Sequence, residues 1–349
     1  MKRYRPFAAL AVTALFIGAC TGPGGSPGES TAASEAGSAA PSESQAAEMP
    51  DKLVLGFVPS REAGQLVEDI QPLADFLTEE LGIEVEGVVS NDYAGLVTAM
   101  QSGQAHMGFL PPYGMVQAVD EAGAEIILQS ARFGSTTYHT QFFTNDPDKY
   151  CEDEPVENTR MSDDQEVTFL NCNGTDRAFD ETPEGPIGIE ALANLEPGTT
   201  VSFVEQTSAS GYIFPATVLI SQGIDPMNDI EPVFAGSHDN SVVTVCMGDA
   251  EVGVSFDDAR TEPVTDCDVA SNVVVFAYGP EIPNDGVAVA GDLPDELKQQ
   301  IKDALLAFAE TEEGATVLDE IYNITAFGEP NLDSLEIVRQ AAAELGYEG

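Results

Sequence analysis

The feature that most restricts the fold is a stretch of sequence that occurs twice, at residues 92–108 and 238–253. Each copy reads as a polar turn, an amphipathic helix, a glycine break and an apolar strand, and each follows a short apolar run. Repeats of this kind predict two lobes built on the same α/β plan, with Rossmann-like connections in each.

The segment before the first copy reads as the start of a parallel sheet. Residues 52–58 form a short apolar run that ends at Pro59-Ser60, which is typical of a buried strand followed by a turn. Leucine and isoleucine then recur at helical spacing over 66–81 until Gly82, and residues 83–89 read as a second strand. The pattern predicts a strand, one helix and a strand.

The N-terminal segment 1–20 has the composition of a secretory signal. Three basic residues precede an apolar run from Phe7 to Ile17, which is too short to span a membrane, and Gly18-Ala19-Cys20 follow. This order resembles a bacterial lipobox, in which the Cys20 thiol is acylated. The alternative is an ordinary signal peptide with a chance cysteine. Residues 21–50 lack aromatic side chains and are interpreted as a flexible tether.

The remaining chain is expected to form one two-lobed unit. Lobe I is assigned to 51–141 plus 277–349 and lobe II to 142–276, so the chain passes between lobes near 140–144 and 276–280. An acidic, asparagine-rich segment at about 144–186 is interpreted as a surface insertion.

Four cysteines follow Cys20, and their even number in an exported chain favours disulfides. The sequence allows three pairings. Cys151 with Cys172 and Cys246 with Cys267 are favoured because they are closest along the chain. A metal site is the competing interpretation, but the chain has no CxxC pair and only three histidines, of which His106 lies in a strand-like run. We therefore expect neither a metal nor another cofactor.

The formal net charge of −47 excludes nucleic acid as a partner. It also implies that an anion site in this chain cannot rest on a basic patch.

Ligands of parallel α/β sheets gather beyond the carboxyl ends of strands. The predicted helix start after the strand at 201–204 carries three hydroxyls, those of Thr207, Ser208 and Ser210. Hydroxyls and helix N-termini donate to tetrahedral oxyanions without any cation. Ordinary helix capping, which needs a single hydroxyl, is the alternative.

At these positions the sequence resembles the PhnD-like phosphonate, phosphite and phosphate binding proteins of ABC importers, which have the type II periplasmic binding protein fold. The resemblance covers about 52–144 and 200–327. It is carried by Asp92-Tyr93-Ala94-Gly95, by residues 208–215, by residues 235–239 and 256–259, and by Ile282-Pro283-Asn284-Asp285.

The resemblance implies a set of ligand-binding residues. The phenols of Tyr93 and Tyr138 approach the ligand, Ser208, Ser210 and the amides of Gly211 and Tyr212 bind its oxygens, and His238 lies beside them. Ala209 stands where the family usually has threonine. Asp257 or Asp258, with Asp285, forms an acidic side that accepts a P–OH proton or a ligand ammonium. For three residues a simpler structural role stays open: packing for Tyr93, and turns for His238 and Asp285.

These features favour an extracytoplasmic solute-binding lipoprotein, anchored through Cys20, that binds a phosphorus oxyanion between its lobes as a monomer and serves an ABC permease. The alternatives are a ligand sensor for a receptor and an enzyme on the same fold. We do not expect an enzyme, because the chain has neither a GxSxG elbow nor metal-spaced His and Cys. The choice among phosphite, phosphate, methylphosphonate and aminoalkyl phosphonates stays open.

Overall fold

The computed structural model describes residues 49–61, 63–132, 134–162, 165–176, 185–261 and 267–347. Residues from Ala46 onward form one compact unit. The predicted signal, Cys20 and nearly all of the tether lie outside the described residues. Within the described ranges, no helix combines the length and the apolar character that crossing a bilayer requires.

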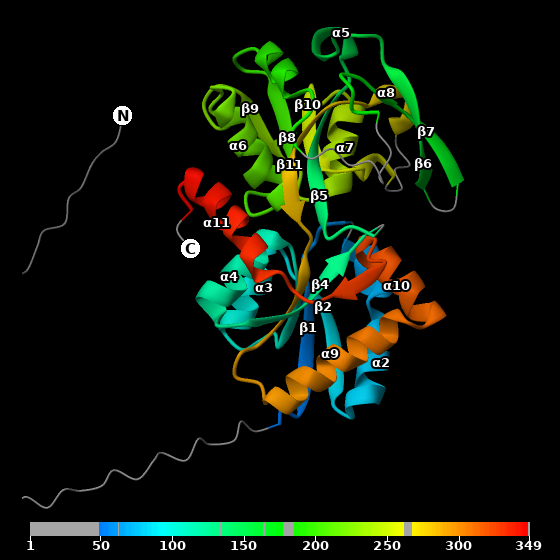
Figure 1. The fold of residues 1–349 in the computed structure, drawn as a ribbon, viewed down its shortest axis with the longest axis vertical. Coiled ribbons are helices and arrows are strands. Elements are labelled where there is room, and N and C mark those ends of the chain that lie inside the picture. Colours follow the sequence, from blue (N-terminus) through cyan, green and yellow to red (C-terminus); the bar gives the residue numbers. More distant parts are fainter. Residues whose placement is uncertain are drawn as a thin grey trace, which may run out of the picture. The chain divides into compact units, whose positions relative to one another are not determined.

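Six strands form the sheet of the first lobe, in the order β13-β4-β12-β3-β1-β2 (Figure 1). They are β1 (Lys52–Phe57), β2 (Glu84–Val89), β3 (Met107–Leu110), β4 (Glu125–Ala131), β12 (Gly286–Val289) and β13 (Ala326–Gly328). The helices of this lobe are α1 (Ala63–Asp69), α2 (Gln71–Leu81), α3 (Tyr93–Gln101), α4 (Pro112–Ala122), α9 (Asp295–Ala309) and α10 (Glu312–Tyr322).

Seven strands form the second sheet, in the order β6-β7-β11-β5-β10-β8-β9. They are β5 (Thr137–Thr144), β6 (Val156–Ser162), β7 (Gln165–Asn171), β8 (Thr200–Phe203), β9 (Glu231–Phe234), β10 (Val252–Phe256) and β11 (Val274–Pro283). Its helices are α5 (Pro147–Tyr150), α6 (Phe214–Ser221), α7 (His238–Cys246) and α8 (Val269–Asn272). The last helix, α11 (Leu335–Glu344), packs on α4 and also contacts α6 and β11.

The duplicated unit predicted from the sequence is present in both sheets. In the first lobe β1 pairs in parallel with β2 and β3, and in the second β8 pairs in parallel with β9 and β10. The side chain of Asp92 caps α3 by accepting from the Gly95 amide, and Ser237 caps α7 by accepting from the Asn240 amide. The two-lobed α/β prediction is therefore confirmed.

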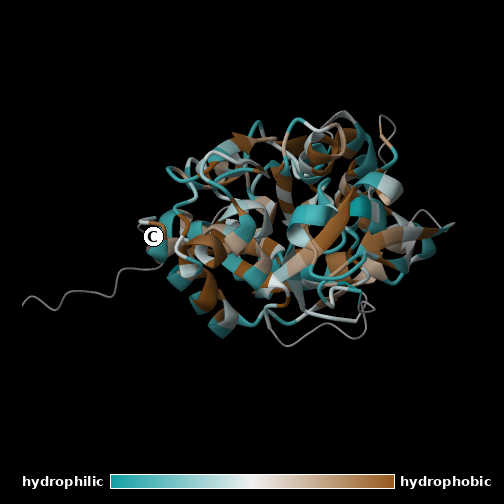
Figure 2. Ribbon diagram, turned by 90° about the horizontal axis from the view of Figure 1, so that it is seen from above, coloured by the Kyte–Doolittle hydropathy of each residue, from teal (hydrophilic) through white to brown (hydrophobic). Residues whose placement is uncertain are grey.

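Apolar strands buried on both faces account for the continuous hydrophobic runs in the sequence. All four residues of β3 and of β12 are buried. The rings of Phe57 and Phe109, on neighbouring strands, stack with centroids 4.8 Å apart. Figure 2 shows the same distribution, with hydrophobic colour concentrated on strands and hydrophilic colour frequent on the peripheral helices.

The single helix predicted over 66–81 is wrong in one respect, because the structure divides it into α1 and α2 at Ile70. Pro72 lies in the first turn of α2, where its missing N–H costs nothing, whereas it would interrupt a continuous helix. The helix ends at Gly82, as the sequence predicts, and the structure shows this glycine in the left-handed conformation.

The predicted lobe boundaries at 141/142 and 276/277 are corrected by the strand pairing. β5 begins at Thr137 and β11 continues to Pro283, and both belong to the seven-stranded sheet along their whole length. The chain therefore passes between the sheets at residues 132–136 and 284–285. The Gly279-Pro280 pair suggests a strand end, but an irregular step in the pairing between Tyr278 and Glu281 accommodates it.

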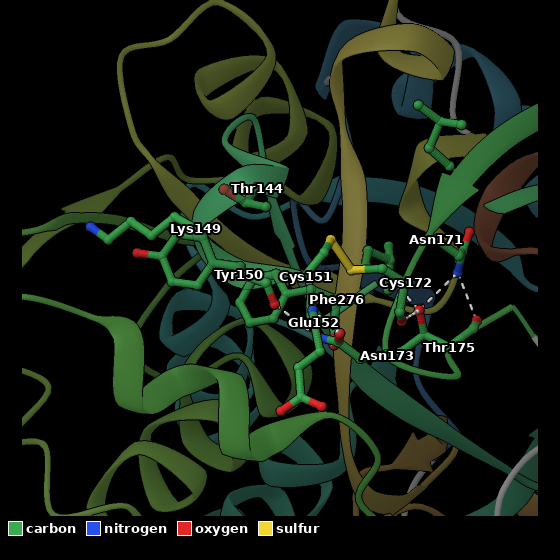
Figure 3. Close-up of a disulfide and its surroundings, with 12 residues drawn as sticks. Thr144, Lys149, Tyr150, Cys151, Glu152, Asn171, Cys172, Asn173, Thr175 and Phe276 are labelled. Carbon is green, nitrogen blue, oxygen red and sulfur yellow. Dashed lines mark hydrogen bonds between the residues drawn. A yellow bond between two sulfur atoms is a disulfide. The ribbon is translucent and has the colours of Figure 1, made fainter. Parts of the chain in front are cut away.

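The insertion at 144–186 is more than a surface excursion. Its strands β6 and β7 form an antiparallel hairpin, and β7 pairs in parallel with β11, so the hairpin extends the sheet. A disulfide joins Cys151 to Cys172 beside the buried ring of Tyr150 (Figure 3). A second disulfide joins Cys246 to Cys267. These are the pairings that short sequence separation favours.

Candidate functional site

A cavity of about 100 Å³ lies where the turns after β1, β3, β8 and β10 meet the passages between the sheets. Its lining includes most of the residues that the resemblance implies: Tyr93, Tyr138, Ser208, Ala209, Ser210, His238, Asp257 and Asp285. The structure adds Val58, Ser60, Arg61, Pro111, Pro112, Arg132, Phe256, Tyr322 and Asn323. The predicted location, at the carboxyl ends of strands and the starts of helices, agrees with this arrangement.

The serine-rich turn after β8 begins a helix whose first turn is a π-turn, Ala209–Ile213. The Ser208 hydroxyl caps this turn by accepting from the Gly211 amide at 3.1 Å. Ser210 is the second residue of this helix. Its side chain is buried and does not cap the helix. Amides in a first helical turn have no preceding acceptor within the helix, so those of Ala209 and Ser210 are available to a ligand in the cavity.

Two of the expected contacts at this turn are corrected. Gly211 and Tyr212 do not line the cavity, because the Gly211 amide donates to Ser208 and the Tyr212 amide donates to the Ser208 carbonyl oxygen at 3.1 Å. Gly211 is needed for packing, since a Cβ atom at this position would lie 2.4 Å from the Cβ of Val204. The ring of Tyr212 packs on Phe203 in the apolar core.

Three tyrosines present phenols to the cavity. Burial raises the pKa of Tyr93, Tyr138 and Tyr322 above the ordinary value, so all three phenols stay protonated and can donate. The Tyr322 phenol donates to the Val58 carbonyl oxygen at 2.7 Å, whereas the buried Tyr93 hydroxyl has no hydrogen-bond partner among the described residues. Tyr138 belongs to β5 and therefore to the second lobe, and Tyr322 at the end of α10 was missed because nothing in its local sequence marks it.

His238 is buried at the start of α7, with Nδ1 2.7 Å from the Ser255 hydroxyl. Burial, with the positive charges of Arg61 and Arg132, lowers its pKa to about 3. The ring is therefore neutral at physiological pH and presents one N–H and one acceptor nitrogen. Its placement favours the cavity-lining role over a simple turn.

The acidic side of the cavity consists of Asp257 and Asp285. The Asp257 carboxylate accepts from the His139 amide at 2.8 Å. The Asp258 carboxylate is fully buried in an ion pair with Arg260 and does not line the cavity, so of the two aspartates that the sequence leaves open, Asp257 is the one at the site. The sequence alone could not separate two adjacent aspartates, because only the surrounding packing determines which one points inward.

Two arginines that the sequence analysis missed also line the cavity. Arg61 follows the turn after β1 and donates to the carbonyl oxygen of Glu320, and Arg132 follows β4 and donates through Nε to the carbonyl oxygen of Tyr322 at 2.6 Å. The sequence analysis argued against a basic patch, and it did not anticipate these two single arginines in the cavity wall. Net charge is a property of the whole surface, whereas the charge within a cavity depends only on the few residues that line it. The available signal was position, since Arg132 directly follows β4 and Arg61 follows the turn after β1.

Contacts across the cavity join the two lobes. The His238 amide donates to the carbonyl oxygen of Ser60 at 3.1 Å, and the Tyr93 amide donates to the Glu205 carboxylate at 3.2 Å. Both donors stand at the first residue of a helix, α7 and α3, in the duplicated units. The two copies of the repeat therefore face each other across the site.

The part of the chain that the structure describes contains no cluster of His, Cys, Asp and Glu suited to a metal ion. His106 has a structural role, because its Nδ1 accepts a hydrogen bond from the Val54 amide at 3.0 Å.

Residues 55–335 match the model of a protein family described as ABC transporter, phosphonate, periplasmic substrate-binding protein. The chain belongs to this family. The family is one of periplasmic substrate-binding components of ABC transporters.

Two individual proteins with phosphate-import or phosphonate-binding names are also similar to this chain. The phosphate-import protein PhnD of Mycolicibacterium smegmatis is 26% identical over 228 residues, which cover 63% of this chain. The match spans 60% of that relative's own length. The phosphonates-binding periplasmic protein of Escherichia coli is 20% identical over 80% of this chain and 73% of its own.

A solved structure of PhnD1 from Prochlorococcus marinus, in complex with methylphosphonate, superposes with a TM-score of 0.67 at 17% identity. The superposition covers 85% of this chain and 99% of that one, and it establishes the two-lobed type II periplasmic binding protein fold.

Proposed function

We propose that this protein binds a small phosphorus oxyanion, namely phosphite, phosphate or a phosphonate, in the cavity and delivers it to an ABC permease. The observation that carries the proposal is the set of neutral donors around one small cavity, the hydroxyls of Ser208 and Ser210 and the phenols of Tyr93 and Tyr138. Hydrogen bonds from such donors to an ionised oxygen are roughly twice as strong as those between neutral groups.

In this proposal, the carboxylates of Asp257 and Asp285 make the cavity selective among anions. A carboxylate only accepts hydrogen bonds, so it attracts a P–OH group and repels an unprotonated oxygen. Sulfate carries no proton at neutral pH and should therefore be rejected, whereas a singly protonated phosphorus oxyanion satisfies both sides of the cavity.

Isothermal titration calorimetry with phosphite, phosphate, methylphosphonate, an aminoalkyl phosphonate and sulfate tests the proposal. We expect at least one phosphorus oxyanion to bind and sulfate not to bind. Preference for sulfate, or no binding of any phosphorus oxyanion, would refute it. Steady turnover of phosphorus esters would instead favour an enzyme, the alternative that the family membership makes less attractive.

We further propose a monomer tethered to the membrane through acylated Cys20. The support is the order of basic, apolar and small residues before this cysteine. The intact mass of protein extracted from membranes tests the anchor, and an unmodified Cys20 would contradict it. The alternative, a ligand sensor, would use the same cavity. It would be recognised by finding a receptor, in place of a permease, among the proteins that bind this chain.

A further inference from the structure

Arg132 and Asp285 form an ion pair in the cavity wall, with Arg132 Nη1 bonded to Asp285 Oδ1. Each residue belongs to a different passage between the two sheets: Arg132 directly follows β4, and Asp285 lies between β11 and β12. The side chains are mostly buried, with exposed fractions of 20% and 11%. The pair therefore joins the two connections at the point where they meet the ligand site.

The backbone around the pair is fixed by further hydrogen bonds between the same two passages. Asn284 donates through its side-chain amide to the carbonyl oxygens of Ser130 and Ser135, at 3.1 and 3.0 Å. The Ser130 amide donates to the carbonyl oxygen of Asp285 at 2.9 Å. Because both passages are held in register, the guanidinium and the carboxylate are presented to the cavity as one unit.

The guanidinium keeps donors for a ligand. Of its five N–H groups, Nε is engaged by the Tyr322 carbonyl oxygen and Nη1 by Asp285, while Nη2 has no hydrogen-bond partner among the residues that the structure describes. Asp285 likewise has a second oxygen, Oδ2, whose contact is the Ser130 hydroxyl at 3.5 Å. A donor and an acceptor of opposite charge thus stand side by side in the wall.

We propose that Arg132 and Asp285 are a specificity-determining pair: Arg132 donates to an ionised oxygen of the ligand while Asp285 accepts from a P–OH group of the same ligand. This inference rests on the proposed function and extends it, since it assigns the positive charge of the site to a residue that the family resemblance does not implicate. The pair is neutral overall, so it recognises a ligand that carries both an ionised and a protonated oxygen. Sulfate gains from Arg132 but is repelled by Asp285.

The proposal predicts opposite effects of two substitutions on ligand choice. Asp285→Asn removes the acceptor charge and leaves Arg132 to act alone, so sulfate should bind at least about tenfold more tightly while phosphate or phosphite weakens. Arg132→Gln leaves the Asp285 charge alone in the wall, so the phosphorus oxyanion should bind about ten- to a hundredfold more weakly and sulfate should still be rejected. The double variant restores neutrality and should bind the phosphorus oxyanion more tightly than Arg132→Gln does.

The experiment is calorimetric titration of the unaltered protein and the three variants with phosphite, phosphate and sulfate, with the melting temperature recorded for each. Arg339→Gln is the matched control, because Arg339 forms an Arg–Asp pair with Asp120 away from the cavity and its loss should leave all dissociation constants unchanged. Asp285→Asn is nearly isosteric, so it tests the sulfate prediction even if Arg132→Gln does not fold.

If the ion pair only stabilises the two passages between the sheets, Asp285→Asn and Arg132→Gln should lower the melting temperature. They should also weaken the binding of every ligand by the same factor. An unchanged ratio of phosphate to sulfate affinity would therefore overturn the assignment. Failure of the unaltered protein to bind any phosphorus oxyanion would refute the proposed function itself, whereas normal binding with an unchanged ratio refutes only the role of this pair.

Discussion

Replacing Ser210 by alanine removes one hydroxyl from the cavity wall and leaves the fold around it in place. The Ser210 side chain is buried and lines the cavity, while its carbonyl oxygen accepts from the Thr140 hydroxyl at 2.6 Å, a bond that alanine preserves. The Ser208 cap is also untouched. The substitution therefore acts on the ligand contact and on the neighbouring phenol of Tyr138.

The expected loss follows from the charge of the ligand. A hydrogen bond to an ionised oxygen is worth about 1.5 to 3 kcal/mol, so the dissociation constant for the preferred phosphorus oxyanion should rise about ten- to a hundredfold. Calorimetric titration measures this directly.

Ser241 provides the matched control in the same lobe. It is also a buried serine, but its hydroxyl donates to the carbonyl oxygens of Val254 and Ser202 and does not line the cavity. Ser241→Ala should lower the melting temperature with little change in affinity. If Ser210→Ala behaves in the same way, with a lower melting temperature and an unchanged dissociation constant, the serine-rich turn is only a helix start and our reasoning about the site is wrong.

Three other predictions concern stability. The pKa of His238 falls from 6.5 in the unfolded chain to about 3 in the folded one, so between these pH values protons bind preferentially to the unfolded state. Acidification through this range should therefore lower the free energy of unfolding by up to about 1.4 kcal/mol per pH unit. Urea unfolding at pH 7 and pH 5 should show a smaller loss for His238→Asn, and an equal loss would contradict the assignment. Arg260→Met, which leaves the Asp258 carboxylate buried without its guanidinium, should destabilise the fold by about 3 to 5 kcal/mol, and adding Asp258→Asn should recover much of this in the same urea assay. Reduction of the Cys246–Cys267 disulfide should cost about 3 kcal/mol of unfolding free energy, and a Cys246→Ser/Cys267→Ser variant whose urea midpoint matches that of the unaltered protein would argue against the bridge.

Local patterns in the sequence predicted much of the fold because their causes are local. The strand over β1, the helix end at Gly82 and the polar turns before α3 and α7 each depend on a few adjacent residues. The division between α1 and α2 was also readable from Pro72, whose ring and missing N–H disfavour a continuous helix. The lobe boundaries were missed because strand pairing between β5 and β11, distant in sequence, determines where each strand ends.

The sequence by itself determined the two-lobed α/β plan, since the repeated turn, helix, glycine and strand pattern has the same meaning in both copies. It also indicated the serine-rich helix start, because hydroxyls at that position are read from adjacent residues. Only the tertiary structure decided that Asp257 and not Asp258 faces the cavity, and that Arg61, Arg132 and Tyr322 join the site. The ends of strands and helices far apart in the chain converge there, and no local pattern specifies which side chains will meet across the passages between two sheets.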